Sequence, residues 1–143
     1  MGTVPVVKMV IPSRLTETPA VQKALLEQVK AHGFPRDAVF AVRLAVDEAL
    51  NNAIRHGNAN DPAREVTVEF AITDKQVKVT VADEGSGFKP DCLPDPTCSA
   101  NIERPCGRGV MLMHAYMTAV RYNKAGNRVT MIKRRDCPGP KSN

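Results

Sequence analysis

The sequence has no apolar run long enough to cross a bilayer, and it has few aromatic residues. Its opening stretch, MGTVPVVKMVIPSR, lacks the basic start, long apolar middle and small-residue cleavage site of a signal peptide. Aromatic residues make up 4% of the 143 residues, and tryptophan is absent. We therefore expect a cytoplasmic protein that has no membrane partner.

The sequence also lacks clustered charge and paired cysteines. It carries 20 Lys and Arg against 15 Asp and Glu, a net charge of +5, and the one basic concentration is KRR at 133–135. Because nucleic-acid surfaces need clustered positive charge and often stacking aromatics, no direct nucleic-acid partner is expected. The four cysteines form no CxxC pair, which argues against a structural zinc site.

What is present is a clear change of hydrophobic period along the chain. Helical spacing of apolar residues alternates with runs of β-branched residues at period two. The predicted order is a strand at 4–13, helices at 18–32 and 37–57, paired strands at 65–72 and 76–83, an irregular segment at 84–109, a helix at 110–117 and a closing hairpin at 119–134. This order predicts one α+β domain over residues 1–143, a two-layer sandwich with helices on one face of a mixed, mainly antiparallel sheet.

The second predicted helix contains VDEALNNAIRHGN, which is too polar for a core helix and poor in charge for a solvent-facing one. Residues four apart share a helix face, so Glu48, Asn52 and His56 form one row. A carboxylate and an amide one turn apart can supply oxygen ligands or polarise a hydroxyl. The alternative is a polar face that makes caps and surface contacts, and this stretch alone favours neither. Gly57 is predicted to end the helix.

Two glycine-containing motifs follow. DEGSGF places Asp83 directly after a predicted strand, where it can accept a hydrogen bond from an amine or simply begin a tight turn. CGRGVMLM places Gly107 and Gly109 at the amino end of a helix, where free N–H groups and the helix dipole attract anions. Arg108 between them suits either a phosphate or solvent. No GxxxxGK[ST] loop is present.

Taken together, DEALNNAIRHG, DEGSGF and GRGVMLM resemble the N, G1 and G2 boxes of the GHKL superfamily, whose ATP-binding domain has the Bergerat fold. The short chain and the stretch HGNANDPAREVTV are most similar to the RsbW-like anti-sigma factor serine/threonine kinases. The resemblance covers roughly residues 11–133, the expected core of a histidine-kinase-like ATPase domain.

This resemblance implies a role for each matching residue. Glu48 matches the acidic residue that acts as general base toward the attacking hydroxyl, and Asn52 matches the asparagine that coordinates Mg²⁺ on the ATP phosphates. Asp83 matches the aspartate that accepts a hydrogen bond from the adenine amino group. Gly85 and Gly87 match glycines that give the base and sugar room.

The second half of the site is implied in the same way. Gly107 and Gly109 match phosphate-contacting glycines, with Arg108 as a further nucleotide contact, and residues 89–106 correspond to the lid over the nucleotide. Where the family often carries Gly-Thr in the closing hairpin, this chain carries Gly126-Asn127.

The function implied is a Mg-ATP-dependent serine/threonine protein kinase that phosphorylates an STAS-type anti-anti-sigma protein and sequesters a sigma factor. The family also implies a homodimer. The alternative is a non-catalytic ATP-binding module whose lid gates partner binding. Two weaker alternatives are the catalytic half of a histidine kinase and a basic interaction domain that binds no nucleotide.

Overall fold

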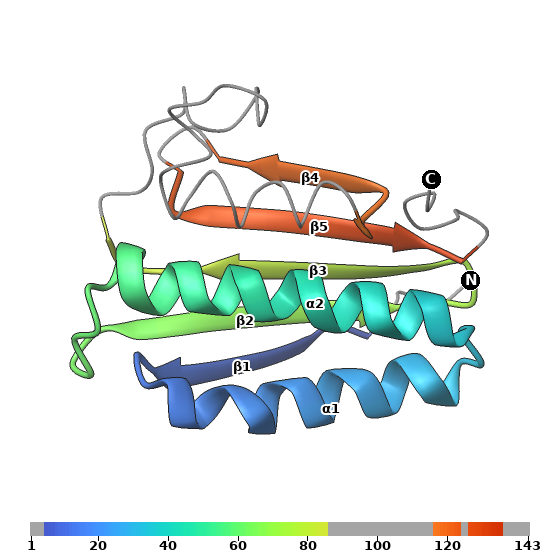
Figure 1. Ribbon diagram of the computed structural model, residues 1–143, viewed down its shortest axis with the longest axis horizontal. Coiled ribbons are helices and arrows are strands. Elements are labelled where there is room, and N and C mark those ends of the chain that lie inside the picture. The colour runs from blue at the N-terminus through green and yellow to red at the C-terminus, as the bar shows by residue number, and fades with distance from the viewer. Residues whose placement is uncertain (1–4, 86–115, 124–125, 136–143) are drawn as a thin grey trace.

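The structure is a computed structural model, and it describes residues 5–85, 116–123 and 126–135. Two long helices lie side by side on one face of a five-stranded sheet (Figure 1). The helical elements are a 3-10 turn η1 (Leu15–Glu17), α1 (Thr18–Ala31), α2 (Arg36–Asn52) and a π-helical turn η2 (Ala53–Gly57). The strands are β1 (Val7–Pro12), β2 (Glu65–Ile72), β3 (Gln76–Ala82), β4 (Ala119–Tyr122) and β5 (Arg128–Arg134).

The sheet has the strand order β1-β2-β3-β5-β4, and every described pair of neighbours is antiparallel. This confirms the predicted α+β sandwich and both predicted hairpins. In the register between β3 and β5, Ala82 pairs with Arg128. The residues that follow β3 therefore lie beside the residues that precede β5, and this edge of the sheet carries the candidate site.

The core fills the space between the sheet and the helices. Along β2, buried and more accessible residues alternate, with Val66, Val68 and Phe70 directed into the core. Leu50 and Ile54, at the carboxyl end of the second helical segment, are fully buried in the same core. Burial of each such side chain contributes about 1.5–3 kcal/mol, so the helix end that bears the candidate residues is held firmly on the sheet.

Several sequence predictions lie outside the described residues. They are the irregular segment from residue 86 to 109, including the expected lid, and most of the helix predicted at 110–117. Within the described ranges, no helix is long and apolar enough to span a membrane.

Candidate functional site

The last turns of α2 carry Glu48 and Asn52. Asn52 is only 6% exposed, and its side-chain nitrogen Nδ2 contacts no hydrogen-bond partner among the described residues. Leaving a buried amide unpaired costs about 1–3 kcal/mol, so this nitrogen, or the amide oxygen after rotation of the group, is suited to binding a polar ligand. Glu48 is partly buried one turn earlier, and burial, followed by the negative charge of Asp47, raises the pKa of its carboxyl group.

Asp83 follows β3 and is held by backbone hydrogen bonds. Its N–H donates to the carbonyl of Asn127 at 2.9 Å, and its Oδ1 accepts from the N–H of Gly85 at 2.8 Å. Burial raises the pKa of Asp83, while the Gly85 hydrogen bond and the positive charge of Arg64 oppose that rise. A carboxylate has about four lone-pair sites, so Asp83 keeps acceptor capacity for a ligand.

Gly57, at the end of η2, packs directly against the segment that begins at Asp83. A Cβ atom on Gly57 would lie 2.3 Å from Cγ of Asp83, and one on Gly85 would lie 1.8 Å from the carbonyl oxygen of Gly57. Among the described glycines, only Gly33 and Gly126 have positive φ. The helical segment ends at Gly57, as predicted, but Gly57 does not have a positive φ. A glycine is required there because two backbone segments approach each other closely.

The π-helical turn also separates His56 from the row in which it was predicted. The N–H of Asn58 donates to the carbonyl of Ala53 at 2.8 Å, five residues back, so the turn is wider than an α-helical one. His56 is exposed, whereas Asn52 is buried. The predicted three-residue row is thus reduced to Glu48 and Asn52.

Asn52 and Asp83 line one small cavity between α2, the ends of β3 and β5, and the β4–β5 turn. The remaining lining residues are Ala49, Ala53, Val81, Tyr122, Gly126, Asn127, Arg128 and Val129. The structure thus brings together a helix residue and a strand-end residue that lie 31 positions apart in the sequence. Glu48 does not line this cavity, but it lies one helical turn from Asn52.

Asn127 secures the segment beside the cavity. Its Nδ2 donates to the carbonyl of Gly85 at 3.1 Å, and its Oδ1 accepts from Nδ2 of Asn123 at 2.8 Å. The residue that replaces the usual family threonine therefore ties the closing hairpin to the segment that contains Asp83.

Asn58 was not identified from the sequence. It is fully buried, and its Oδ1 accepts from the N–H of Glu84 at 2.8 Å. The only available signal was a single asparagine directly after Gly57, and asparagine in that setting is equally typical of an exposed turn.

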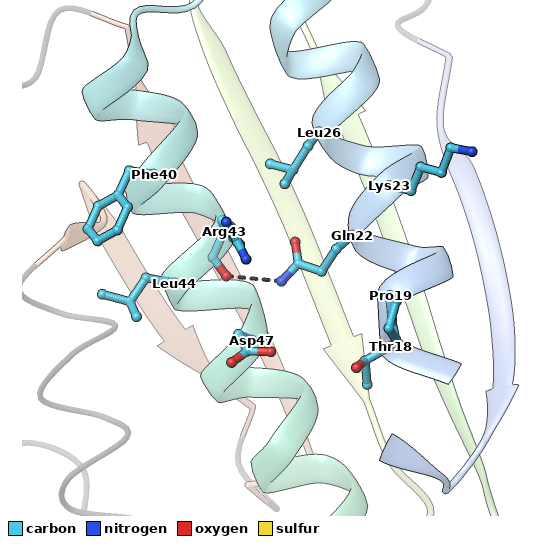
Figure 2. Close-up of a pocket in the computed structure, with 9 residues that line it drawn as sticks. All are labelled: Thr18, Pro19, Gln22, Lys23, Leu26, Phe40, Arg43, Leu44 and Asp47. Carbon is cyan, nitrogen blue, oxygen red and sulfur yellow. Dashed lines mark hydrogen bonds between the residues drawn. The ribbon is translucent and has the colours of Figure 1, made fainter. Parts of the chain in front are cut away.

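A larger cavity lies elsewhere, as a groove of about 680 Å³ between α1 and α2 (Figure 2). Gln22 spans it and donates from Nε2 to the carbonyl of Arg43 at 3.0 Å, and Phe40 at its margin is 55% exposed. The groove is lined by Asp47 but by none of the predicted site residues. The larger cavity therefore lies away from the residues that the sequence predicts to bind the nucleotide. We place the candidate site at those residues because of their chemistry.

The remaining predicted site residues, which are Gly87, Gly107, Arg108 and Gly109, lie outside the described residues, as does the lid at 89–106. In the part of the chain that the structure describes, no group of three or more His, Cys, Asp or Glu side chains could hold a metal ion.

Comparison with known proteins identifies the family of the chain. The sequence profile of the histidine kinase-like ATPase domain family matches residues 11–133. The serine-protein kinase RsbW of Bacillus subtilis is 29% identical over 134 residues, which cover 89% of this chain and 84% of that protein. RsbW of Listeria monocytogenes is 32% identical, covering 71% of this chain and 69% of that protein. The anti-sigma F factor of Oceanobacillus iheyensis is 30% identical, covering 67% of each.

A solved structure of the RsbU and RsbW domains of Rv1364c from Mycobacterium tuberculosis has the same fold. It aligns with a TM-score of 0.63 at 17% identity, over 97% of this chain and 35% of that longer chain. The chain belongs to the histidine kinase-like ATPase domain family and, within it, to the RsbW-type serine-protein kinases.

Proposed function

We propose that this protein is a Mg-ATP-dependent serine/threonine kinase that phosphorylates an STAS-type anti-anti-sigma protein and sequesters a sigma factor. The observation that carries the proposal is the shared cavity of Asn52 and Asp83, in which a buried amide and a half-buried carboxylate both have capacity for a ligand. ATP use and kinase activity are typical of this family, and one of the related proteins is named as an anti-sigma factor.

In this proposal Asp83 binds the base and Asn52 binds at the phosphates. The carboxylate of Asp83 accepts a hydrogen bond from the adenine amino group, with Gly85 leaving room for the base. The amide oxygen of Asn52 is a hard-cation ligand of the kind Mg²⁺ takes alongside phosphate oxygens. When bound, Mg²⁺ would neutralise phosphate charge. Gly87, Gly107, Arg108 and Gly109 complete the nucleotide contacts, and residues 89–106 form the lid.

Glu48 is proposed as the general base that receives the proton of the substrate hydroxyl. Its partial burial supports this role, because the resulting rise in its pKa makes the carboxylate a better proton acceptor. Phosphoryl transfer depends mainly on positioning and charge neutralisation, so a strongly basic group is not required. The acceptor hydroxyl would approach from outside the Asn52–Asp83 cavity, in keeping with the place of Glu48 beyond its lining.

The partners and setting belong to the same proposal. The chain would act as one domain with its core at 11–133, as a homodimer, in the cytoplasm where sigma factors act. The alternative is a module of the same family that binds ATP without transferring phosphate.

Transfer of labelled phosphate tests the proposal. Wild-type protein incubated with γ-labelled ATP and an STAS protein from the same organism should label that protein on serine or threonine. Glu48→Gln should lower the rate about 100-fold or more, because general bases contribute roughly 10²–10⁴-fold, while ATP affinity should change little.

Glu27→Gln is the matched control, since it removes an exposed carboxylate of α1 that does not raise the pKa of Glu48, and it should leave transfer intact. Undiminished labelling in Glu48→Gln would refute the role of Glu48. ATP binding without labelling of any STAS protein would favour the non-catalytic alternative.

A further inference from the structure

Asn58 lies where four segments of the chain meet, and every polar group of the residue is hydrogen-bonded. Its Nδ2 donates to Oγ of Ser13 at 2.8 Å and to the carbonyl of Glu65 at 3.0 Å, and its Oδ1 accepts from the N–H of Glu84 at 2.8 Å. Its own N–H donates to the carbonyl of Ala53. One fully buried residue thereby links the end of β1, the start of β2, η2 and the residue after Asp83.

Ser13, which accepts a hydrogen bond from Asn58, is itself held in place by hydrogen bonds. Oγ of Ser13 donates to the carbonyl of Arg64 at 2.7 Å, and the N–H of Ser13 donates to the same carbonyl at 3.1 Å. The N–H of Glu65 also donates to the carboxylate of Glu84. A fully satisfied buried polar network of this kind holds one geometry, because any rotation of Asn58 would leave several groups unpaired.

Two asparagines therefore hold the backbone on and around Asp83. Asn127 holds the N–H of Asp83 through its own carbonyl and holds the carbonyl of Gly85 through its amide, and Asn58 holds the N–H of Glu84 between them. The Asn127 contacts tie this segment to the hairpin, and the Asn58 contact ties it to the end of η2. With Gly57 against the carboxylate, little freedom remains for the Asp83 side chain.

We propose that Asn58 is a positioning residue for nucleotide recognition, which with Ser13 holds Asp83 in the orientation that selects the 6-amino group of adenine. This inference rests on the proposed function, because it assumes that Asp83 contacts the base. It adds that selectivity for adenine depends on a residue of the η2 junction that lies outside the lining of the Asn52–Asp83 cavity.

The test compares affinity for ATP with affinity for purine riboside triphosphate, which lacks the 6-amino group. Wild type should prefer ATP by roughly 10–100-fold, the value of a hydrogen bond to a charged group. In Asn58→Ala the affinities for the two nucleotides should differ by no more than about threefold, chiefly because the affinity for ATP falls. Ser13→Ala, which keeps the Glu84 bond but removes its anchor, should give an intermediate preference.

Thr80→Val is the matched control. Thr80 is 8% exposed on β3, and its hydroxyl lies 3.3 Å from that of Thr130, so the substitution removes a partly buried side-chain hydrogen bond from the strand that leads to Asp83. It should leave the preference unchanged. An unchanged preference in Asn58→Ala, or an equal loss in Thr80→Val, would overturn the positioning role. Absence of ATP binding by wild type would overturn the proposed function as well.

Amide hydrogen exchange provides a measurement that needs no nucleotide, and Ser13→Ala keeps the test available if Asn58→Ala does not fold. Faster exchange at Glu84 with unchanged exchange at Val79, in the middle of β3, would support the proposal. Equal acceleration at both amides would show general loosening and contradict it.

Discussion

At the scale of single residues, the candidate site keeps polar groups in places that are unfavourable for stability. Asp83 is a carboxylate whose pKa is raised by burial, and Asn52 has an unpartnered amide nitrogen within the described residues. Buried polar groups are normally paired, and exceptions cluster where a ligand completes the pairing. Both residues are therefore better explained by binding than by folding.

Because the ionised Asp83 is unfavourable for stability but suited to binding, Asp83→Asn should affect the two properties differently. A carboxyl group whose folded pKa is raised contributes stability that is fully present below its unfolded pKa and lost as the pH rises through its folded pKa. At neutral pH the ionised group is thus unfavourable. Asp83→Asn, which can keep the acceptor for Gly85, should melt at the same or a higher temperature than wild type at pH 7, while ATP affinity falls roughly 10–100-fold.

Asp74→Asn is a control at a carboxyl group whose pKa is shifted in the opposite direction, downward. The hydrogen bond from His32, with Nδ1 3.0 Å from Oδ1, is the main cause that lowers the pKa of Asp74, so its contribution is present above the unfolded pKa and lost as the pH falls through the folded pKa. This variant should not be stabilised at pH 7 and should bind ATP normally. A lower melting temperature with normal ATP affinity in Asp83→Asn would contradict the assignment.

At the scale of elements, the junction of η2 with the end of β3 is the feature that assembles the site. The sequence predicted the helix, the hairpin and a glycine between them, because helical and strand periods and glycine are local signals. It did not predict the π-helical turn or the reason for Gly57. Those depend on Gly57 lying against Asp83 and on Asn58 bonding Glu84, and no local pattern encodes either contact.

Gly57→Ala tests this junction. The added Cβ would clash with the carboxylate of Asp83, and overpacking of this kind typically costs about 1–3 kcal/mol. Because the carboxylate must move to relieve the clash, ATP affinity should fall at least about tenfold, as for partial loss of its hydrogen bond. Chemical denaturation and nucleotide titration measure the two effects separately.

Gly33→Ala is the control with a comparable effect on stability. Gly33 has φ of +74° and open space around a Cβ, so alanine there is strained in the backbone by about 1–2 kcal/mol but touches nothing. It should destabilise the protein and leave ATP affinity unchanged. Normal ATP affinity in Gly57→Ala would show that the junction does not shape the site.

At the scale of the whole molecule, the site exists only because the sheet register places the end of β3 beside the start of β5, under the last turn of α2. The α+β architecture and the two hairpins followed from the order of the predicted elements. The pairing of Asn52 with Asp83 followed only from the resemblance to a family, since no periodic pattern relates the two positions. The roles of Asn58 and Asn127 required the structure.

The central claim is that Asn52 and Asp83 contact bound Mg-ATP, and calorimetric titration of the wild-type protein with ATP, with and without Mg²⁺, tests it most directly. The account predicts one site per chain with a dissociation constant of roughly 1–100 µM, in the usual range for enzyme substrates, and at least about tenfold weaker binding without Mg²⁺. A folded protein that shows no binding at about 1 mM ATP with Mg²⁺ present would contradict the account.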